Sequence, residues 1–305
     1  MIGLLVVGLA AVALVVWIAG VLLLHSVYYA DPDRQRRDRT PADLGLVHEP
    51  LAVTTEDGLS LVGWYLPGTR DTVVVVSGGG RRPPGETLGM CAGLQRSGFH
   101  VVTFGWRGTV GCDAARHTQG VWEQRDMTAA VAATRRRVGD MPMVMLGLCL
   151  GAIVSINHAA DDPSVRAVCA DSPITSPVDL LYDTARRRTG FLRPLFAWPV
   201  VLLVRLRTGA WLTKMRPVDR IMDLSPRPLL LMYSRDDPIV PRRRVEAMFN
   251  RAREPKRLEF LMADEHARAY RMDREGYMAR VVGFFDEALS GSLHVAVDQE
   301  VSAAR

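Results

Sequence analysis

Residues 144–155 read Val-Met-Leu-Gly-Leu-Cys-Leu-Gly-Ala-Ile-Val-Ser, which places Cys149 at the centre of the pentapeptide Gly147-Leu-Cys-Leu-Gly151. The apolar run before the pentapeptide and the small residues after it predict a strand, a sharp turn and the start of a helix. Such a turn strains its central residue and exposes that side chain at the helix N-terminus, so small flanking residues are needed. The stretch makes Cys149 a candidate nucleophile, with a buried core cysteine as the alternative.

A thiol at this position would be chemically activated. The helix dipole and the backbone amides of the first helical turn favour the thiolate over the thiol. The amide of Leu150 would also be placed to hold a developing oxyanion.

Short apolar segments alternate with amphipathic ones on both sides of this motif. Residues 51–66 predict a hairpin closed by an Asp57-Gly58 turn. The alternation that follows predicts an α/β fold with a mostly parallel sheet and helices on both of its faces. Strands are expected at residues 72–76, 100–104, 143–146, 166–169, 228–233 and 257–261, and helices at residues 86–96, 122–137, 152–160, 242–253 and 273–289.

A cysteine nucleophile needs a base within hydrogen-bond reach and an acid that orients this base. Asp237 follows the expected strand 228–233 and His266 follows the strand 257–261, so both would lie at carboxyl ends of strands, where ligands bind. Taken singly, Asp237 would be a turn or helix-capping residue and His266 a solvated loop histidine. The order nucleophile, acid, base along the chain nevertheless predicts a catalytic triad.

Residues 176–224 interrupt the alternation and predict a helical cap insertion within a domain of residues 47–289. The centre of this insertion, residues 190–205, is apolar, but Arg193 and two prolines interrupt it and argue against a bilayer span. We expect cap helices whose apolar face lines an acyl pocket or touches the bilayer surface, with ordinary core packing as the alternative. The tail of residues 290–305 has little periodicity and is expected to be poorly ordered.

Residues 2–24 contain no charged side chain and are long enough to cross a bilayer core of about 30 Å as a helix. We expect a single-pass transmembrane anchor over residues 1–30 and a juxtamembrane linker over residues 31–46. A cleaved signal peptide is the alternative, but no basic segment precedes the apolar run. Four arginines between residues 34 and 39 follow the span, so the positive-inside rule predicts a cell-membrane protein with a cytoplasmic domain.

Composition excludes several classes of function. The net charge is +5, but the arginines are scattered or lie beside apolar segments, and no DNA- or RNA-binding motif is present, so no nucleic-acid partner is expected. The Gly78-Gly79-Gly80 run lacks the Lys-Ser/Thr of a phosphate-binding loop, and we expect no metal and no organic cofactor. We expect free thiols, without zinc ligation or a disulfide framework, at the four cysteines, Cys91, Cys112, Cys149 and Cys169.

With these residues the chain resembles the α/β-hydrolase fold over roughly residues 46–289, and most of all the membrane-anchored serine hydrolases. The acid loop of that group commonly reads Asp-x-x-Val-Pro, which residues 237–241 match and which favours Asp237 over Asp236. The resemblance also implies an oxyanion site after the first parallel strand, with backbone donors at Gly79 or Gly80 and at Leu150. Further shared segments are Pro41-Ala-Asp-Leu-Gly-Leu46, Asp57-Gly58, Gly63-Trp-Tyr-Leu-Pro67, Arg216-Pro-Val-Asp219 and Arg227-Pro-Leu-Leu230.

Three positions depart from that pattern. The usual serine is Cys149, a replacement known from dienelactone hydrolases. The usual His-Gly of the oxyanion loop is Ser77-Gly78, and the usual Asp of the Asp-x-Arg-Gly-x-Gly loop is Gly105. Backbone donors need no particular side chain, so the cysteine is the departure that decides the function.

The sequence therefore predicts a membrane-tethered acyl hydrolase that uses Cys149, His266 and Asp237 and forms an acyl-cysteine intermediate. Its substrate would be a small-molecule or lipid-like ester or thioester. An acyltransferase would use the same groups, with an alcohol or thiol in place of water. A catalytically inactive binding or scaffold protein stays open, because fold does not fix function, and a redox-active Cys149 is a further alternative.

Overall fold

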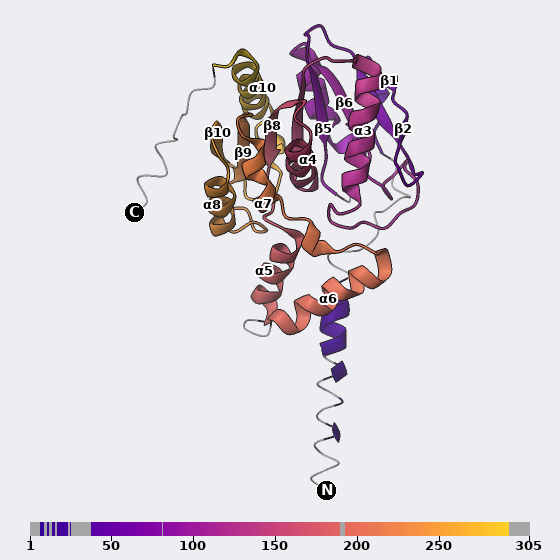
Figure 1. The fold of residues 1–305 in the computed structure, drawn as a ribbon, viewed down its shortest axis with the longest axis vertical. Coiled ribbons are helices and arrows are strands. Elements are labelled where there is room, and N and C mark those ends of the chain that lie inside the picture. Colours follow the sequence, from indigo (N-terminus) through magenta and orange to yellow (C-terminus); the bar gives the residue numbers. More distant parts are fainter. Residues whose placement is uncertain are drawn as a thin grey trace, which may run out of the picture.

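The computed structural model describes residues 38–80, 82–189 and 193–292, together with residues 7, 8, 11, 14, 15, 17–23 and 25. An eight-stranded sheet in the order β1-β4-β6-β5-β7-β8-β9-β10 forms its centre (Figure 1). The six strands from β6 to β10 are parallel, whereas β1 and β4 run antiparallel at one edge. The strands are β1 Glu49–Pro50, β4 Gly63–Leu66, β5 Val73–Ser77, β6 His100–Phe104, β7 Met143–Leu148, β8 Val165–Asp171, β9 Leu229–Ser234 and β10 Lys256–Leu261.

Helices cover both faces of the sheet. One face packs against α3 Glu123–Val138, α4 Leu150–Asp161 and α8 Arg242–Arg251. The other face packs against α2 Leu88–Arg96 and α10 Arg274–Ser290. A strand that is covered on both sides must be apolar on both sides, which explains why all five residues of β5 are buried.

The predicted parallel strands and their helices are confirmed, with ends displaced by two residues at most. The predicted hairpin is confirmed only in its first part, where β2 Val53–Thr54 pairs with β3 Ser60–Leu61. The next residues leave the hairpin as β4, which pairs with β1 and β6 in the main sheet. All four residues of β4 are buried, and a strand without an exposed face is stabilised more by the two-sided main sheet than by a hairpin.

Arg107 connects the hairpin turn to the helical layer. Its side chain is almost fully buried, and it donates hydrogen bonds to Asp126 (2.9 and 2.7 Å) and to Asp57 (2.9 and 3.2 Å). Gly105 precedes it where the resembled family has aspartate, and a Cβ there would lie 2.6 Å from Sγ of Cys112. The Arg107-Gly108 part of the loop, which matches the resembled pattern, therefore has a structural role.

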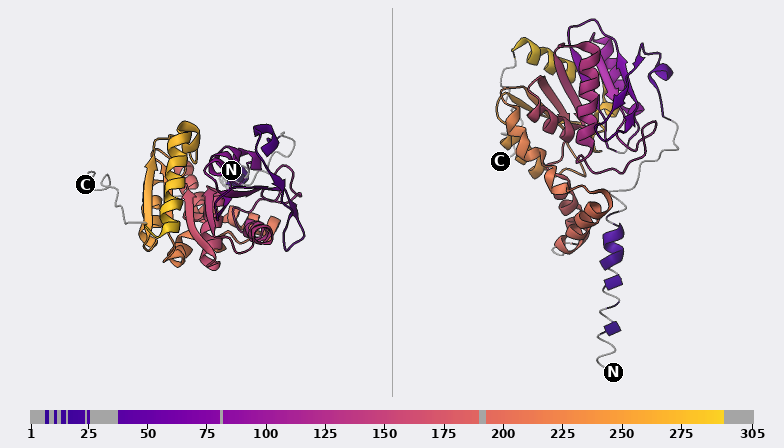
Figure 2. Two further views of the ribbon diagram at one scale, coloured as in Figure 1. Left: turned by 90° about the horizontal axis from the view of Figure 1, so that it is seen from above. Right: turned by 45° about the vertical axis from the view of Figure 1, so that its right-hand side comes forward.

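The segment between β8 and β9 forms helices beyond the carboxyl ends of the strands (Figures 1 and 2). Within the described part of the chain, no single helix is long and apolar enough to cross a membrane. Eleven of the 23 residues of the expected apolar span, residues 2–24, lie outside the described residues, as do residues 293–305 of the expected tail. The segment between β8 and β9 is called the cap below. Its helices are α5 Pro177–Thr189, α6 Arg193–Thr208, η4 Leu212–Lys214, α7 Pro217–Arg220 and η5 Ile221–Leu224.

Candidate active site

Cys149 occupies a strained turn between β7 and α4, as the sequence predicts. Its φ of 52° and ψ of −106° lie in a region that residues with a side chain rarely adopt. A Cβ on Gly147 would lie 2.5 Å from the carbonyl oxygen of Gly151, and a Cβ on Gly151 would lie 2.2 Å from that of Ser77. Glycines are therefore required on both sides, and the thiol is held at the start of α4.

Asp237 and His266 come together in the loops that follow β9 and β10. Nδ1 of His266 lies 2.8 Å from Oδ2 of Asp237, and Oδ1 of Asp237 accepts hydrogen bonds from the amides of Ile239 (2.8 Å) and Val240 (3.0 Å). The Asp237 side chain is only 2% exposed. These contacts fix the carboxylate, and the carboxylate in turn fixes the plane of the imidazole and directs Nε2 away from Asp237.

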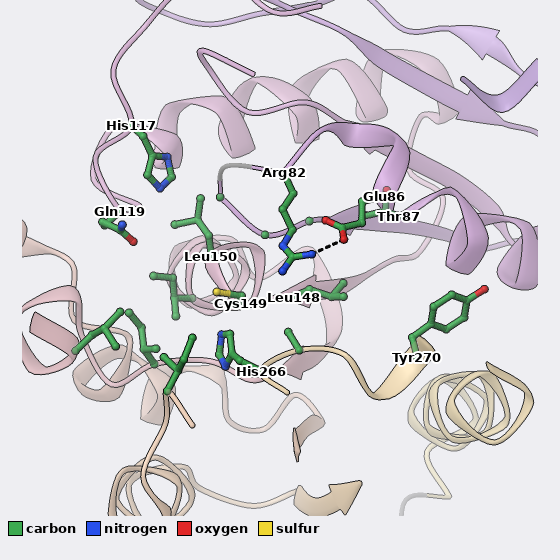
Figure 3. A pocket seen from close by; sticks show the side chains of 18 of the residues that line it. Arg82, Glu86, Thr87, His117, Gln119, Leu148, Cys149, Leu150, His266 and Tyr270 are labelled. Atoms are coloured by element: carbon green, nitrogen blue, oxygen red, sulfur yellow. Dashed lines mark hydrogen bonds and ion pairs between the residues drawn. The ribbon is translucent and has the colours of Figure 1, made fainter. Parts of the chain in front are cut away.

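The imidazole of His266 points toward the sulfur of Cys149 (Figure 3). Burial alone would raise the pKa of Cys149, but His266, the Leu150 amide and Arg82 bring it below its usual value. Burial alone would lower the pKa of His266, but Cys149 and Asp237 raise it above its usual value. Both directions favour a thiolate beside an imidazolium, which is the reactive form of a cysteine nucleophile.

The loop that follows β5, the candidate oxyanion loop, is held through the backbone carbonyl of Gly78. The carbonyl of Gly78 accepts hydrogen bonds from the indole of Trp106 (2.9 Å) and from the amide of Gly151 (3.1 Å). Ser77, which stands where the resembled hydrolases have histidine, is buried, and its hydroxyl lies 3.2 Å from that of Ser155. The role of Trp106 could not be predicted from the sequence, because its partner is a buried backbone oxygen that no sequence motif marks.

A second histidine–carboxylate pair lines the same site, and the sequence analysis missed it as well. Nδ1 of His117 lies 2.9 Å from Oε1 of Glu123, and both side chains are buried. Glu123 also accepts hydrogen bonds from the backbone amides of Thr118 and Gly120 and from the Thr118 hydroxyl. Burial alone would raise the pKa of Glu123, but His117 and Thr118 lower it to about 2.

Cys149, His266, Leu150 and the candidate oxyanion glycines share one cavity of about 620 Å³ with His117. Of the three cationic side chains in its lining, Arg82 and Arg271 form ion pairs with Glu86. None of the α6 side chains that the structure describes, residues 194–208, is part of the lining. The other lining residues include the apolar Met90, Leu148, Ile153, Ile174, Leu180 and Ile239 and the cationic Arg187. The cavity thus brings together a candidate nucleophile, a candidate base with its acid partner, and candidate backbone donors, which is the set of groups that acyl transfer requires.

Comparison of the sequence with known proteins gives remote relatives. No model of a known protein family matches the chain. The chain is 25% identical over 292 residues to the uncharacterized protein YfhR of Escherichia coli K12, an alignment that covers 92% of this chain and 94% of YfhR. It is also 25% identical over 223 residues to the uncharacterized protein YqkD of Bacillus subtilis, covering 66% of this chain and 71% of YqkD.

Solved structures share the architecture. The Pyrococcus furiosus esterase Pf2001 superposes with a TM-score of 0.68 at 22% identity, over 85% of this chain and 98% of the esterase. The α/β hydrolase GrgF from Penicillium superposes with a TM-score of 0.65 at 20% identity, over 80% of this chain and all of GrgF. The esterase EaEST of Exiguobacterium antarcticum has a TM-score of 0.58 at 15% identity, over 78% of this chain and all of EaEST. Sheet order, turn geometry and these superpositions agree that the chain has the α/β-hydrolase fold.

Proposed function

We propose that this protein is a membrane-tethered acyl hydrolase that cleaves esters or thioesters with Cys149 as nucleophile, His266 as base and Asp237 as orienting acid. One observation carries the proposal: a cysteine in the strained turn faces an imidazole whose other nitrogen is held 2.8 Å from a buried carboxylate. The pKa directions of Cys149 and His266 support the same assignment.

The first half-reaction transfers the acyl group to the enzyme. The Cys149 thiolate attacks the acyl carbonyl, and the carbonyl electron pair moves to oxygen, where the amides of Leu150 and of Gly79 or Gly80 donate hydrogen bonds. The tetrahedral intermediate then collapses to a thioester. The departing alcohol or thiol takes the proton from Nε2 of His266.

The second half-reaction returns the enzyme to its starting form. Neutral His266 removes a proton from water as the water oxygen attacks the acyl-cysteine. The carbon–sulfur bond breaks, the acid is released, and the thiolate and imidazolium are restored. An alcohol or thiol in place of water would make the same site an acyltransferase.

Mixed polarity in the cavity supports a lipid-like acyl substrate. Apolar side chains such as Leu180 and Ile239 suit an acyl chain, while Arg82 and Arg187 suit a polar or anionic head. Two of the superposed structures are named as esterases, which agrees with ester chemistry. We expect hydrolysis of medium or long acyl esters to exceed that of acetate, and equal rates across chain lengths would contradict this substrate class.

The membrane tether is the part of the proposal that rests on sequence. Residues 2–24 are apolar, and arginines follow them, so the catalytic domain is proposed to lie in the cytoplasm at the cell membrane. Protease added outside sealed, right-side-out vesicles should leave the domain intact. Complete digestion in intact vesicles would contradict this orientation.

A time course of thiol alkylation, followed by mass spectrometry, tests the catalytic proposal. Cys149 should react at neutral pH far faster than Cys91, Cys112 and Cys169, which are buried. Cys149→Ala should abolish hydrolysis of p-nitrophenyl esters. Equal labelling of all four cysteines, together with no hydrolysis by the intact protein, would favour the inactive binding or scaffold protein.

A further inference from the structure

Helix α6 of the cap has two apolar faces. Its inner face, which includes Ala197, Val200, Val201 and Val204, is buried against Leu181 and Ala185 of α5. Its outer face exposes Leu195 (57%), Trp198 (50%), Leu202 (52%) and Leu206 (74%). A spacing of three, four and four residues places these four side chains on one side of the helix, so they form a continuous stripe, called the outer stripe below.

The outer stripe has no partner in the catalytic site. Residues 194–208 of α6 do not line the cavity, so a substrate bound beside Cys149 does not cover the stripe. Four large apolar side chains in a row on the surface of a monomer are characteristic of a contact surface.

The N-terminal segment lies against this helix. The indole of Trp17 donates a hydrogen bond to the carbonyl of Leu195 (2.8 Å), and a Cβ on Gly20 would lie 2.6 Å from the ring of Phe196. Val21 is only 8% exposed and joins the cap cluster. Figures 1 and 2 agree that the described N-terminal residues lead away from the cap on the side opposite the sheet.

The described N-terminal residues are apolar on their outer side as well. Leu14, Val15, Ile18, Leu22 and Leu23 are between 43% and 64% exposed. The exposed apolar surfaces of α6 and of the N-terminal residues therefore lie side by side. The acyl chains of a lipid bilayer would cover both surfaces at once, without a further protein.

Cationic side chains flank the outer stripe. Arg116 donates a hydrogen bond to the carbonyl of Arg207 (3.1 Å), and the guanidinium of Arg205 lies 5.3 Å from the ring centre of Trp211, which is 40% exposed. No carboxylate of the described residues forms an ion pair with these three arginines. Arginines and tryptophans beside an apolar stripe suit the headgroup layer of an anionic membrane.

We infer that α6 lies in the surface of the bilayer that holds the N-terminal segment, with the outer stripe among the acyl chains and the arginines at the headgroups. This inference rests on the membrane tether of the proposed function. It adds a second membrane contact, which holds the cap, and with it the cavity residues Leu180 and Arg187 of α5, at the lipid surface. An ester in that leaflet then reaches Cys149 without crossing water.

The test uses the full chain in vesicles of phosphatidylcholine and phosphatidylglycerol. An environment-sensitive fluorophore is attached to Leu202→Cys in a Cys149→Ser background, where the other native cysteines are buried. The matched control carries the fluorophore at Asp140→Cys, an exposed position before β7 at the opposite end of the sheet. We expect a blue shift and quenching by nitroxide lipids at position 202 and neither at position 140.

The outcomes separate the inference from the tether. A protein that floats with the vesicles while its position-202 fluorophore stays as exposed to water as that at position 140 overturns the inference and leaves the tether intact. A protein that does not float with the vesicles overturns both. Neither result affects the catalytic assignment, which thiol labelling tests independently.

A triple variant, Leu195→Ser, Leu202→Ser and Leu206→Ser, provides a functional readout. Its substitutions are on the outer face, so the buried face of α6 is unchanged. Hydrolysis of a short soluble ester should stay the same, while hydrolysis of a long-chain ester embedded in vesicles should fall by about tenfold. Equal rates on the embedded ester for the variant and the unaltered protein would overturn the inference.

Discussion

Two histidine–carboxylate pairs face the same cavity, and their nitrogen–oxygen distances are nearly equal, but only the His266–Asp237 contact has the geometry of a hydrogen bond. Nδ1 of His266 lies 2.8 Å from Asp237, and Nδ1 of His117 lies 2.9 Å from Glu123. The second ring nitrogen distinguishes them. Nε2 of His266 faces the thiol of Cys149, whereas Nε2 of His117 lies against the backbone at Gly80, where a Cβ would be 2.7 Å away.

The two carboxylates also serve different neighbours. Asp237 accepts hydrogen bonds from two amides of its own loop and leaves one oxygen for His266. Glu123 is fully buried and binds the amides of Thr118 and Gly120, so it holds the loop that carries His117. The proposed function therefore assigns the role of base to His266, whose second nitrogen faces a thiol. The His117–Glu123 pair stabilises a wall of the cavity.

Removing each imidazole should give the largest contrast. We expect His266→Ala to lower kcat/KM for a p-nitrophenyl ester by about 10⁴-fold, because the thiolate loses its proton partner. His117→Ala should lower it by no more than about tenfold, since only a wall of the cavity changes. Steady-state kinetics on both variants, with circular dichroism as the control for folding, measure this contrast. Equal losses would mean that His117 also takes part in the reaction.

The reactivity of Cys149 should depend strongly on His266 and little on His117. The pKa of Cys149 lies below its usual 9.0 because His266 outweighs burial. In His266→Ala the thiol of Cys149 stays buried but loses the imidazole that stabilises its thiolate. Its pKa should therefore rise, and alkylation at pH 7 should slow by at least about tenfold. Alkylation rates measured between pH 5 and 10 give the pKa of Cys149 in the unaltered protein and in His266→Ala. A pKa shifted equally by His117→Ala would remove the distinction between the two pairs.

For the free energy of unfolding we expect the opposite order, with Glu123 contributing more than Asp237. Glu123→Gln places an amide donor where the carboxylate accepts from Thr118 and Gly120, so the free energy of unfolding should fall by about 3 kcal/mol. Asp237→Asn retains the oxygen that accepts from Ile239 and Val240, and we expect a loss of about 1 kcal/mol. Urea denaturation measures both values. A larger loss for Asp237→Asn would reverse the structural roles assigned here.

The smallest effect is the dependence of this difference on pH. The folded pKa of Glu123, about 2, lies below its usual 4.5, so its ionisation stabilises the folded state above pH 4.5. This contribution is lost as the pH falls from 4.5 toward 2. The stability difference between the unaltered protein and Glu123→Gln should therefore narrow over this range in urea titrations. A difference that is constant over the range would show that Glu123 does not ionise on its own in the folded state.

Much of the site could be predicted because its parts follow local rules. The pentapeptide around Cys149 marks a strained turn, and Asp237 and His266 each follow an apolar strand. Parallel strands bring their carboxyl ends to the same edge of the sheet, so three distant segments meet. His117 and Glu123 could not be found in this way, because nothing in a polar loop and the following helix indicates that both become buried.

The cap shows the same division. The apolar stretch of residues 190–205 predicts helix, but its sequence alone leaves three destinations open: pocket, bilayer or core. The structure excludes the pocket for α6, because none of its described residues lines the cavity, and it divides the remaining apolar residues between a buried and an exposed face. A helix with apolar residues all around carries no signal for which of its faces will be covered.

The sequence by itself determined the alternation of strands and helices, the turn at Cys149 and the order of the three candidate catalytic residues, because these depend on side chains within a few positions of one another. Only the tertiary structure decided that β4 joins the main sheet, that Trp106 holds the candidate oxyanion loop, and that Trp17 contacts Leu195, 178 residues away. Contacts of this kind depend on which surfaces the chain brings together, and local periodicity does not encode that choice.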